Sequence, residues 1–173
     1  KELEKTDCYV AAVNGEDGSA AVFGYNKKSG MKRVSADGKV TKVNLQLPEY
    51  QATGKESDDM ENFVTSAVYA DNKLFVTDLN WVVYEVDPQT GEMSKAFSDI
   101  SEKVNRLIAA GTEFALMTDK GIQFADAKSG ALAERMQNDD VLQQAVGKIS
   151  KSHNTDSNNI AMTMGDSGDE LYY

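Results

Sequence analysis

Short runs of β-branched and aromatic residues alternate with polar turns along most of this chain. The clearest stretch lies between residues 64 and 97, where such runs are separated by Asp71-Asn72, by Asp78-Leu79-Asn80 and by the segment from Asp87 to Gly91. Asn, Asp and Gly tolerate positive φ, so these turns are typical of β-hairpins. The pattern predicts consecutive strands that pair as an antiparallel meander.

The same pattern occurs more than once, which makes this a repeat protein. Segments 31–40, 83–93 and 122–132 each consist of a β-type run, an Asp, a short turn closed by Gly and a second β-type run. A repeated four-stranded antiparallel unit predicts the blades of a β-propeller, because a blade buries its faces only between neighbouring blades. We therefore expect an all-β propeller fold. A β-sandwich or an open stack of sheets is the alternative.

The repeats divide the sequence into about three and a half blades within a single propeller-like domain, 1–173. The expected blades cover residues 8–47, 64–97, 105–136 and, incompletely, 159–173. Because the last blade is cut short, the sequence resembles a fragment of a longer propeller. One short helix is expected at 138–149, where Asn138 provides an N-cap and apolar residues recur at helical spacing.

Charge and cysteine content narrow the classes of partner. The chain carries 28 Asp and Glu against 18 Lys and Arg, a net charge of −10. Nucleic acids and anionic lipid surfaces both require clustered cations, so neither is an expected partner. The single cysteine, Cys8, cannot form an internal disulfide, and no apolar run is long enough to span a membrane. The acidic segment 48–62 is interpreted as an insertion between blades, either a solvated linker or a loop that favours basic partners.

Two of the turns carry a family signature. The segments from Tyr84 to Gly91 and from Gln123 to Gly130 resemble the Asp-x-x-Thr/Ser-Gly hallmark of quinoprotein-type (PQQ-like) propeller repeats. In that family the motif closes the hairpin between the outer two strands of a blade, and the Asp and the Thr or Ser fix the turn. The resemblance therefore implies a propeller blade around Asp87-Thr90 and another around Asp126-Ser129.

The chain also departs from that family. The Trp that usually follows the Gly is replaced by Lys95, Ala96 and Phe97 in one repeat and by Glu134 and Arg135 in another. The acidic and cysteine residues that hold the quinone and calcium in the enzymes are not visible, so no cofactor is expected. The chain is more similar to non-catalytic propellers of bacterial extracellular lipoproteins. That resemblance implies an extracellular or cell-envelope location, an upstream lipid anchor and a neighbouring domain in the same polypeptide.

The candidate binding residues lie in the turns between the second and third strands of the blades. In a propeller these turns open on the same face as the connections between blades, which is the customary binding face. Trp81 follows Asp78-Leu79-Asn80 directly and could stack on a sugar or anchor a peptide. Burial between blades is the alternative for this Trp. The equivalent turn of the next repeat contributes Lys120, so Asp78, Asn80, Trp81 and Lys120 form the candidate ligand-binding set.

Metal and catalytic sites are not expected. Asp-rich turns at 14–18, 156–159 and 166–170 offer oxygen ligands but lack the acidic residue that closes an EF-type loop, so they are interpreted as hairpin turns. His153 is the one histidine and has no partner residues at metal-ligand spacing, so it is interpreted as a solvated loop residue. No catalytic constellation is recognisable.

Three functions are compatible with this sequence. The leading hypothesis is a non-enzymatic binding or scaffolding domain that recognises a protein or carbohydrate through the loops between blades. The rival is a fragment of a propeller-class hydrolase or lyase whose catalytic residues lie partly outside this chain. The third is a structural module that positions a neighbouring domain.

Overall fold

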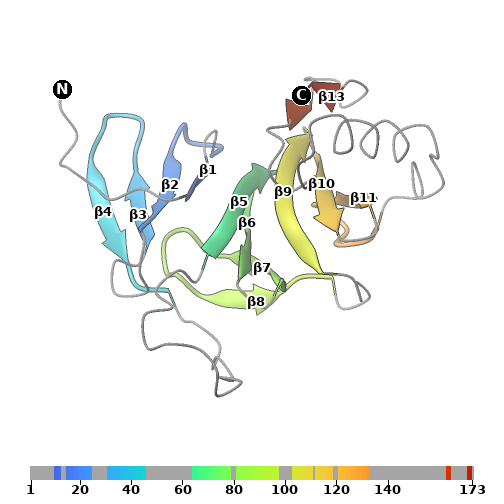
Figure 1. Cartoon of the computed structure of the whole chain (residues 1–173). Coiled ribbons are helices and arrows are strands. Elements are labelled where there is room, and N and C mark those ends of the chain that lie inside the picture. Colours follow the sequence, from blue (N-terminus) through green and yellow to red (C-terminus); the bar gives the residue numbers. More distant parts are fainter. Residues whose placement is uncertain are drawn as a thin grey trace, which may run out of the picture.

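The described part of the chain consists of antiparallel β-sheets (Figure 1). The computed structural model describes residues 10–12, 15–24, 31–45, 64–78, 81–97, 103–110, 112–118, 121–132, 163–164 and 171–172. Each strand in these sheets pairs with the next one along the chain, which is the meander predicted from the sequence. The all-β fold built from four-stranded antiparallel units is therefore confirmed.

The described strands form sheets that follow one another along the chain. The first sheet contains β1 (Val10–Ala12), β2 (Ala20–Phe23), β3 (Met31–Val34) and β4 (Val40–Val43). The second contains β5 (Val64–Ala70), β6 (Lys73–Asp78), β7 (Val83–Val86) and β8 (Met93–Lys95). The third contains β9 (Val104–Ala110), β10 (Glu113–Thr118) and β11 (Gly121–Asp126), and β12 (Thr163–Met164) pairs with β13 (Leu171–Tyr172).

Some predicted elements lie outside the described residues. They are the helix at 138–149, the insertion at 48–62 and the turn of the incomplete fourth blade. The fourth strand of the third sheet is described only at its start, where Leu132 bridges Ala125 in antiparallel fashion. The division of the chain into blades at 8–47, 64–97, 105–136 and 159–173 stays a prediction.

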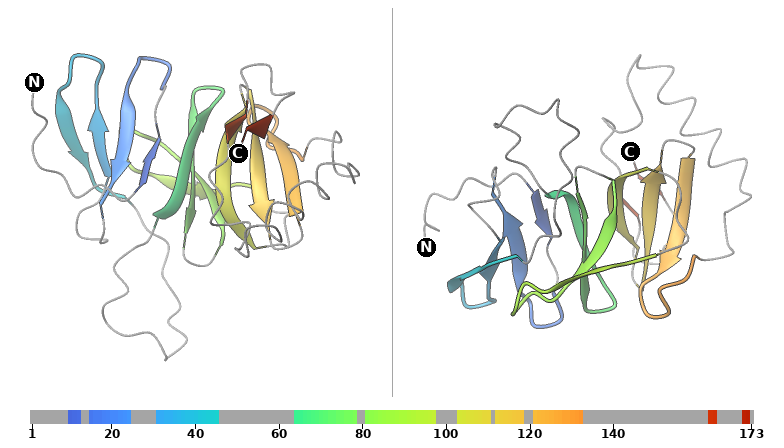
Figure 2. Two further views of the ribbon diagram at one scale, coloured as in Figure 1. Left: turned by 45° about the horizontal axis from the view of Figure 1, so that its top comes forward. Right: turned by 90° about the horizontal axis from the view of Figure 1, so that it is seen from below.

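The first strand of each sheet lies innermost. Strand β5 packs against β1 on one side and against β9 on the other, and β12 packs against β9. Figures 1 and 2 show these sheets side by side, with β5–β8 between β1–β4 and β9–β11. Adjacent sheets that meet along their first strands are the arrangement of blades in a propeller.

The middle sheet, β5–β8, is buried on both of its faces. Side chains along each strand point alternately to the two faces, and each set packs against a neighbouring sheet. On β6, Leu74 and Val76 point toward the first sheet and pack in a cluster with Phe23 and Met31. Phe75, between them, points the other way and stacks on Phe114 of the third sheet with ring centroids 4.6 Å apart. Continuous apolar runs, rather than alternating polar and apolar residues, follow from this two-sided burial.

The Asp…Gly turns are closed by side-chain hydrogen bonds. The Asp87 carboxylate accepts hydrogen bonds from the amides of Gln89 and Thr90 at 2.7 and 2.9 Å. Asp126 accepts from the amide and the hydroxyl of Ser129, both at 2.6 Å. These bonds hold the pKa of both carboxyl groups below its usual value. The expectation that Asp and Thr or Ser fix the turn is confirmed at both sites.

Two equivalent glycines in these turns have different surroundings. Gly91 and Gly130 both adopt left-handed backbone, with φ of 77° and 69°. A Cβ at Gly130 would meet no atom within 4 Å, whereas a Cβ at Gly91 would clash with the backbone oxygen of Asn44, the residue that follows β4 of the first sheet. Gly91 is therefore required by a contact between blades as well as by its own φ.

This difference predicts unequal effects of the same substitution. Gly130→Ala should lower the free energy of unfolding by about 1–2 kcal/mol, the cost of a left-handed non-glycine residue. Gly91→Ala should cost roughly 1–3 kcal/mol more, because the added methyl group also overpacks the contact with Asn44. Chemical denaturation of both variants measures the difference. Equal losses would contradict the blade contact at Gly91.

Candidate functional site

The turn between β6 and β7 is organised around Asp78. This residue is 1% exposed, and its Oδ1 accepts a hydrogen bond of 2.8 Å from the amide of Val82. Its Oδ2 accepts a longer bond, 3.5 Å, from the hydroxyl of Tyr84. Burial, together with the nearby Asp78 charge, raises the pKa of Tyr84, so its phenol stays protonated and able to donate at neutral pH. Asp78 lies beneath the turn and acts as its internal support.

Trp81 sits at the tip of this turn in a strained backbone conformation. Its φ is 60°, in the left-handed region that costs a non-glycine residue about 1–2 kcal/mol. Backbone hydrogen bonds hold it there: the Trp81 amide donates to the Asp78 carbonyl at 3.0 Å, and the Asp78 amide donates to the Val82 carbonyl at 3.2 Å. The Trp81 carbonyl accepts a bond of 3.3 Å from the amide of Val104, at the start of β9. The turn is thus tied to the next blade.

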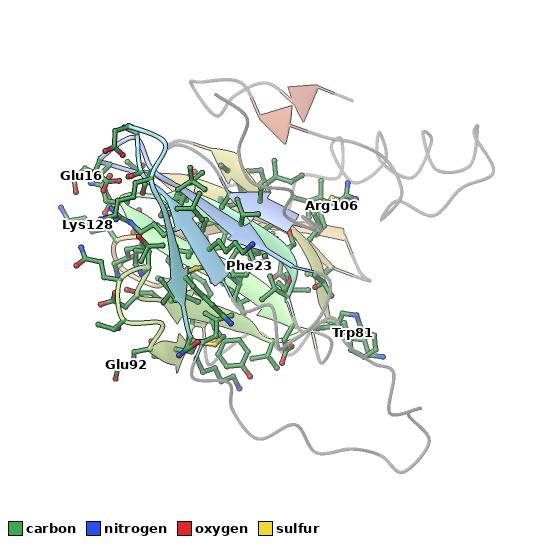
Figure 3. The ribbon with its side chains drawn as sticks, turned by 90° about the vertical axis from the view of Figure 1, so that its left-hand side faces the viewer. Glu16, Phe23, Trp81, Glu92, Arg106 and Lys128 are labelled. Atoms are coloured by element: carbon green, nitrogen blue, oxygen red, sulfur yellow. The ribbon has the colours of Figure 1, made fainter. Side chains whose placement is uncertain are left out.

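The indole ring of Trp81 lies at the surface. It is 40% exposed, the highest value for a large hydrophobic side chain in the described part of the chain. Figure 3 shows Trp81 projecting beyond the strands on the side opposite Glu16, Glu92 and Lys128. Burial of the ring between blades, the alternative drawn from the sequence, is therefore not what the structure shows. The backbone of Trp81, and not its ring, joins the two blades.

A lysine missed by the sequence reasoning lies over this ring. The Nζ of Lys103 is 4.0 Å from the centroid of the Trp81 ring, within the range of a cation–π contact. Lys103 is exposed and directly precedes β9 in the connection between the second and third sheets. The only available sequence signal was its place in an interblade connection, on the face where binding was expected.

The structure brings together two of the four predicted binding residues. Asp78 and Trp81 belong to one turn, with Asp78 enclosed and Trp81 exposed. Asn80 and Lys120 lie outside the described residues. The described geometry thus consists of an exposed aromatic ring, a cation over it and a buried carboxylate that fixes the turn.

The remaining candidates give no metal or catalytic centre among the residues whose placement is described. No three His, Cys, Asp or Glu side chains there are grouped to hold a metal ion. In the turn at 14–18, Asp17 pairs with Arg33 and accepts a bond of 3.0 Å from the Ser19 amide. Bonds from Ser19 are the main cause of the lowered pKa of Asp17. Cys8, His153 and the turns at 156–159 and 166–170 lie outside the described residues.

A polar cavity of about 480 Å³ lies at the opposite end of the middle sheet, beside the turn from Asp87 to Gly91. Its wall includes Lys73 and Glu85, which form an ion pair at 3.2 Å. Asp87 also lines it, but the carboxylate is already engaged by the amides of its own turn. The cavity therefore offers polar contacts without an arranged acid and base.

Within the described residues, no helix has the length and apolarity to cross a bilayer.

Similar folds occur among solved structures, although no protein-family model and no curated protein matches this sequence. The β-propeller domain of Cps50 (Swd1) from Myceliophteria thermophila is 13% identical, with a TM-score of 0.51 over 99% of this chain and 50% of that one. The extracellular domain of the putative one component system BT4673 from B. thetaiotaomicron is 17% identical, with a TM-score of 0.47 over 77% and 17% of the two chains. The N-terminal domain of Nup159 is 10% identical, with a TM-score of 0.46 over 77% and 35%.

The similarity to the Cps50 domain shows a β-propeller fold for this chain, and at 13% identity it shows the fold alone. The chain spans between 17% and 50% of the length of these three solved proteins. The resemblance to quinoprotein-type repeats is thus supported at the level of the propeller.

Trp81 is the single Trp of this chain, so the Trp fluorescence of the protein reports the environment of this turn. Asp78→Ala removes the acceptor of the Val82 amide and the Tyr84 hydroxyl. It should cost about 1–3 kcal/mol of unfolding free energy and shift the Trp81 emission to longer wavelength as the turn loosens. Asp87→Ala is the matched control, since it removes a turn carboxylate far from Trp81 and should leave the emission unchanged. An unchanged spectrum in Asp78→Ala would contradict the supporting role of Asp78.

Proposed function

We propose that this chain is a non-enzymatic binding or scaffolding domain of a larger extracellular bacterial protein, which recognises a protein or carbohydrate through its interblade loops. The observation that carries the proposal is the exposed ring of Trp81 on a turn held by Asp78 and by β9. Large aromatic side chains are typical anchors of binding surfaces, because they bury much area for few rotatable bonds.

The strained backbone of Trp81 supports a functional role for this turn. A Gly or Asn at the same position would adopt the left-handed conformation at little or no cost. Strained residues persist where the surroundings fix them and are frequent at ligand-binding sites. Here hydrogen bonds from two blades fix the backbone of the turn, so less backbone entropy is lost when a ligand binds.

The proposed site extends on both sides of Trp81. Asp78 is its positioning residue, since its carboxylate contacts the turn and not the surface. Asn80, adjacent in sequence, and Lys120, in the equivalent turn of the next repeat, are proposed to flank the ring. The site would then span the connection from the second blade to the third.

The extracellular, lipid-anchored setting and the neighbouring domain belong to the same proposal. They rest on the resemblance of the Asp87…Gly91 and Asp126…Gly130 turns to quinoprotein-type propeller repeats, together with an acidic, cysteine-poor composition similar to that of non-catalytic propellers in bacterial extracellular lipoproteins. A hydrolase or lyase is less well supported by the described residues, because the carboxylates of Asp17, Asp78, Asp87 and Asp126 are occupied by hydrogen bonds in their own turns.

Two substitutions at position 81 test this function. Trp81→Ala and Trp81→Gly should each weaken by tenfold or more the binding of peptides or glycans selected on the wild-type protein from a displayed peptide library and a glycan array. Trp81→Gly should be about 1 kcal/mol more stable than Trp81→Ala, because glycine relieves the strain at φ 60°. Circular dichroism and denaturation verify folding.

The pair separates binding from packing. A ring that served mainly to pack the blades would make both variants strongly unstable. Selected ligands that bound both variants as tightly as the wild type would contradict the proposed site.

A further inference from the structure

We infer that the Trp81 ring is a receptor for a cationic side chain and that Lys103 occupies it in the free protein, to be displaced by a Lys or Arg of a basic partner protein. This inference rests on the proposed function, since it takes Trp81 as the binding residue and names the chemistry of its ligand. Its basis is the position of the Lys103 ammonium, 4.0 Å from the ring centroid.

The position of Lys103 over the Trp81 ring allows another cation to replace it. Lys103 and Trp81 are both exposed, so the ammonium group leaves the ring for water at little cost. A guanidinium or ammonium from another chain would make the same contact with the same face of the indole. Trp is also the aromatic side chain that binds cations most strongly, because its ring face carries the most negative quadrupole.

The charge of the protein favours a cationic ligand over an anionic one. With 28 acidic against 18 basic side chains, the net charge of −10 attracts cations and repels acidic glycans or acidic peptides at long range. This long-range attraction adds to that of the ring face for an ammonium or guanidinium group.

Removal of Lys103 should change the affinity for the ligand in a direction that depends on the charge of the ligand. If Lys103 competes with the ligand for the ring, its removal strengthens binding. If Lys103 instead contacts an anionic ligand directly, its removal weakens binding. The direction of the change in affinity therefore distinguishes a basic partner from an acidic one.

The probe is a fluorescein-labelled Gly-Ser peptide carrying two arginines, compared with the same peptide carrying citrulline, which keeps the shape but loses the charge. Fluorescence anisotropy of the peptide with the full chain gives the affinity. Lys95→Ala is the matched control for Lys103→Ala, because Lys95 is exposed on β8 and its loss changes the net charge by the same amount. The comparison of these two variants therefore removes the contribution of the general attraction between the acidic protein and the peptide.

We expect Lys103→Ala to bind the arginine peptide about two- to fivefold more tightly than Lys95→Ala does, which corresponds to an exposed cation–π contact. Trp81→Ala and the double variant Trp81→Ala/Lys103→Ala should both lose this gain, and the citrulline peptide should bind weakly to all variants. Lys103→Arg, which keeps a cation over the ring, should resemble the wild type.

Two outcomes overturn the inference while leaving the proposed function intact. One is weaker or unchanged binding in Lys103→Ala relative to Lys95→Ala. The other is Trp81-dependent binding of neutral or acidic glycans with none of the arginine peptide. If Trp81→Ala left the binding of every probe unchanged, the proposed function itself would be overturned.

Discussion

A propeller sheet has two apolar faces, and it can bury both only against neighbouring sheets. In β6, Leu74 and Val76 pack toward the first sheet while Phe75 packs toward Phe114 of the third. Neither face has a helix to cover it within the described residues. The sheets therefore stabilise one another, and the turns at their ends are held in position by packing that lies elsewhere.

The turn at Trp81 shows how this scaffold serves a surface site. Val104 begins β9, the innermost strand of the third sheet, and its amide bonds to the Trp81 carbonyl of the second sheet. The contact that aligns two blades thus also fixes the backbone of the residue that we propose to bind. The strain at Trp81 is offset by the packing and hydrogen bonds of the blades, which hold its backbone in the left-handed conformation.

The sequence predicted the sheets because their signals are local and repeated. Apolar runs marked the strands, and Asp87…Gly91 and Asp126…Gly130 marked the outer hairpins with residues that only such turns require. The environment of Trp81 could not be predicted in the same way. A Trp next to a strand is as compatible with burial as with exposure. Its residue type also does not predict the left-handed φ that Trp81 adopts. Lys103 belongs to a connection that does not repeat, and its contact with the ring depends on how two blades meet.

Amide hydrogen exchange measures whether the Trp81 turn belongs to the same rigid unit as the blade cores. The amides of Val82 and Val104 donate to Asp78 and Trp81, one within the turn and one between the blades. We expect both amides to exchange as slowly as those of Leu74 to Val76 in β6, through the same global opening. Fast exchange of Val82 and Val104 beside slow exchange in β6 would show a loose turn and would contradict this expectation.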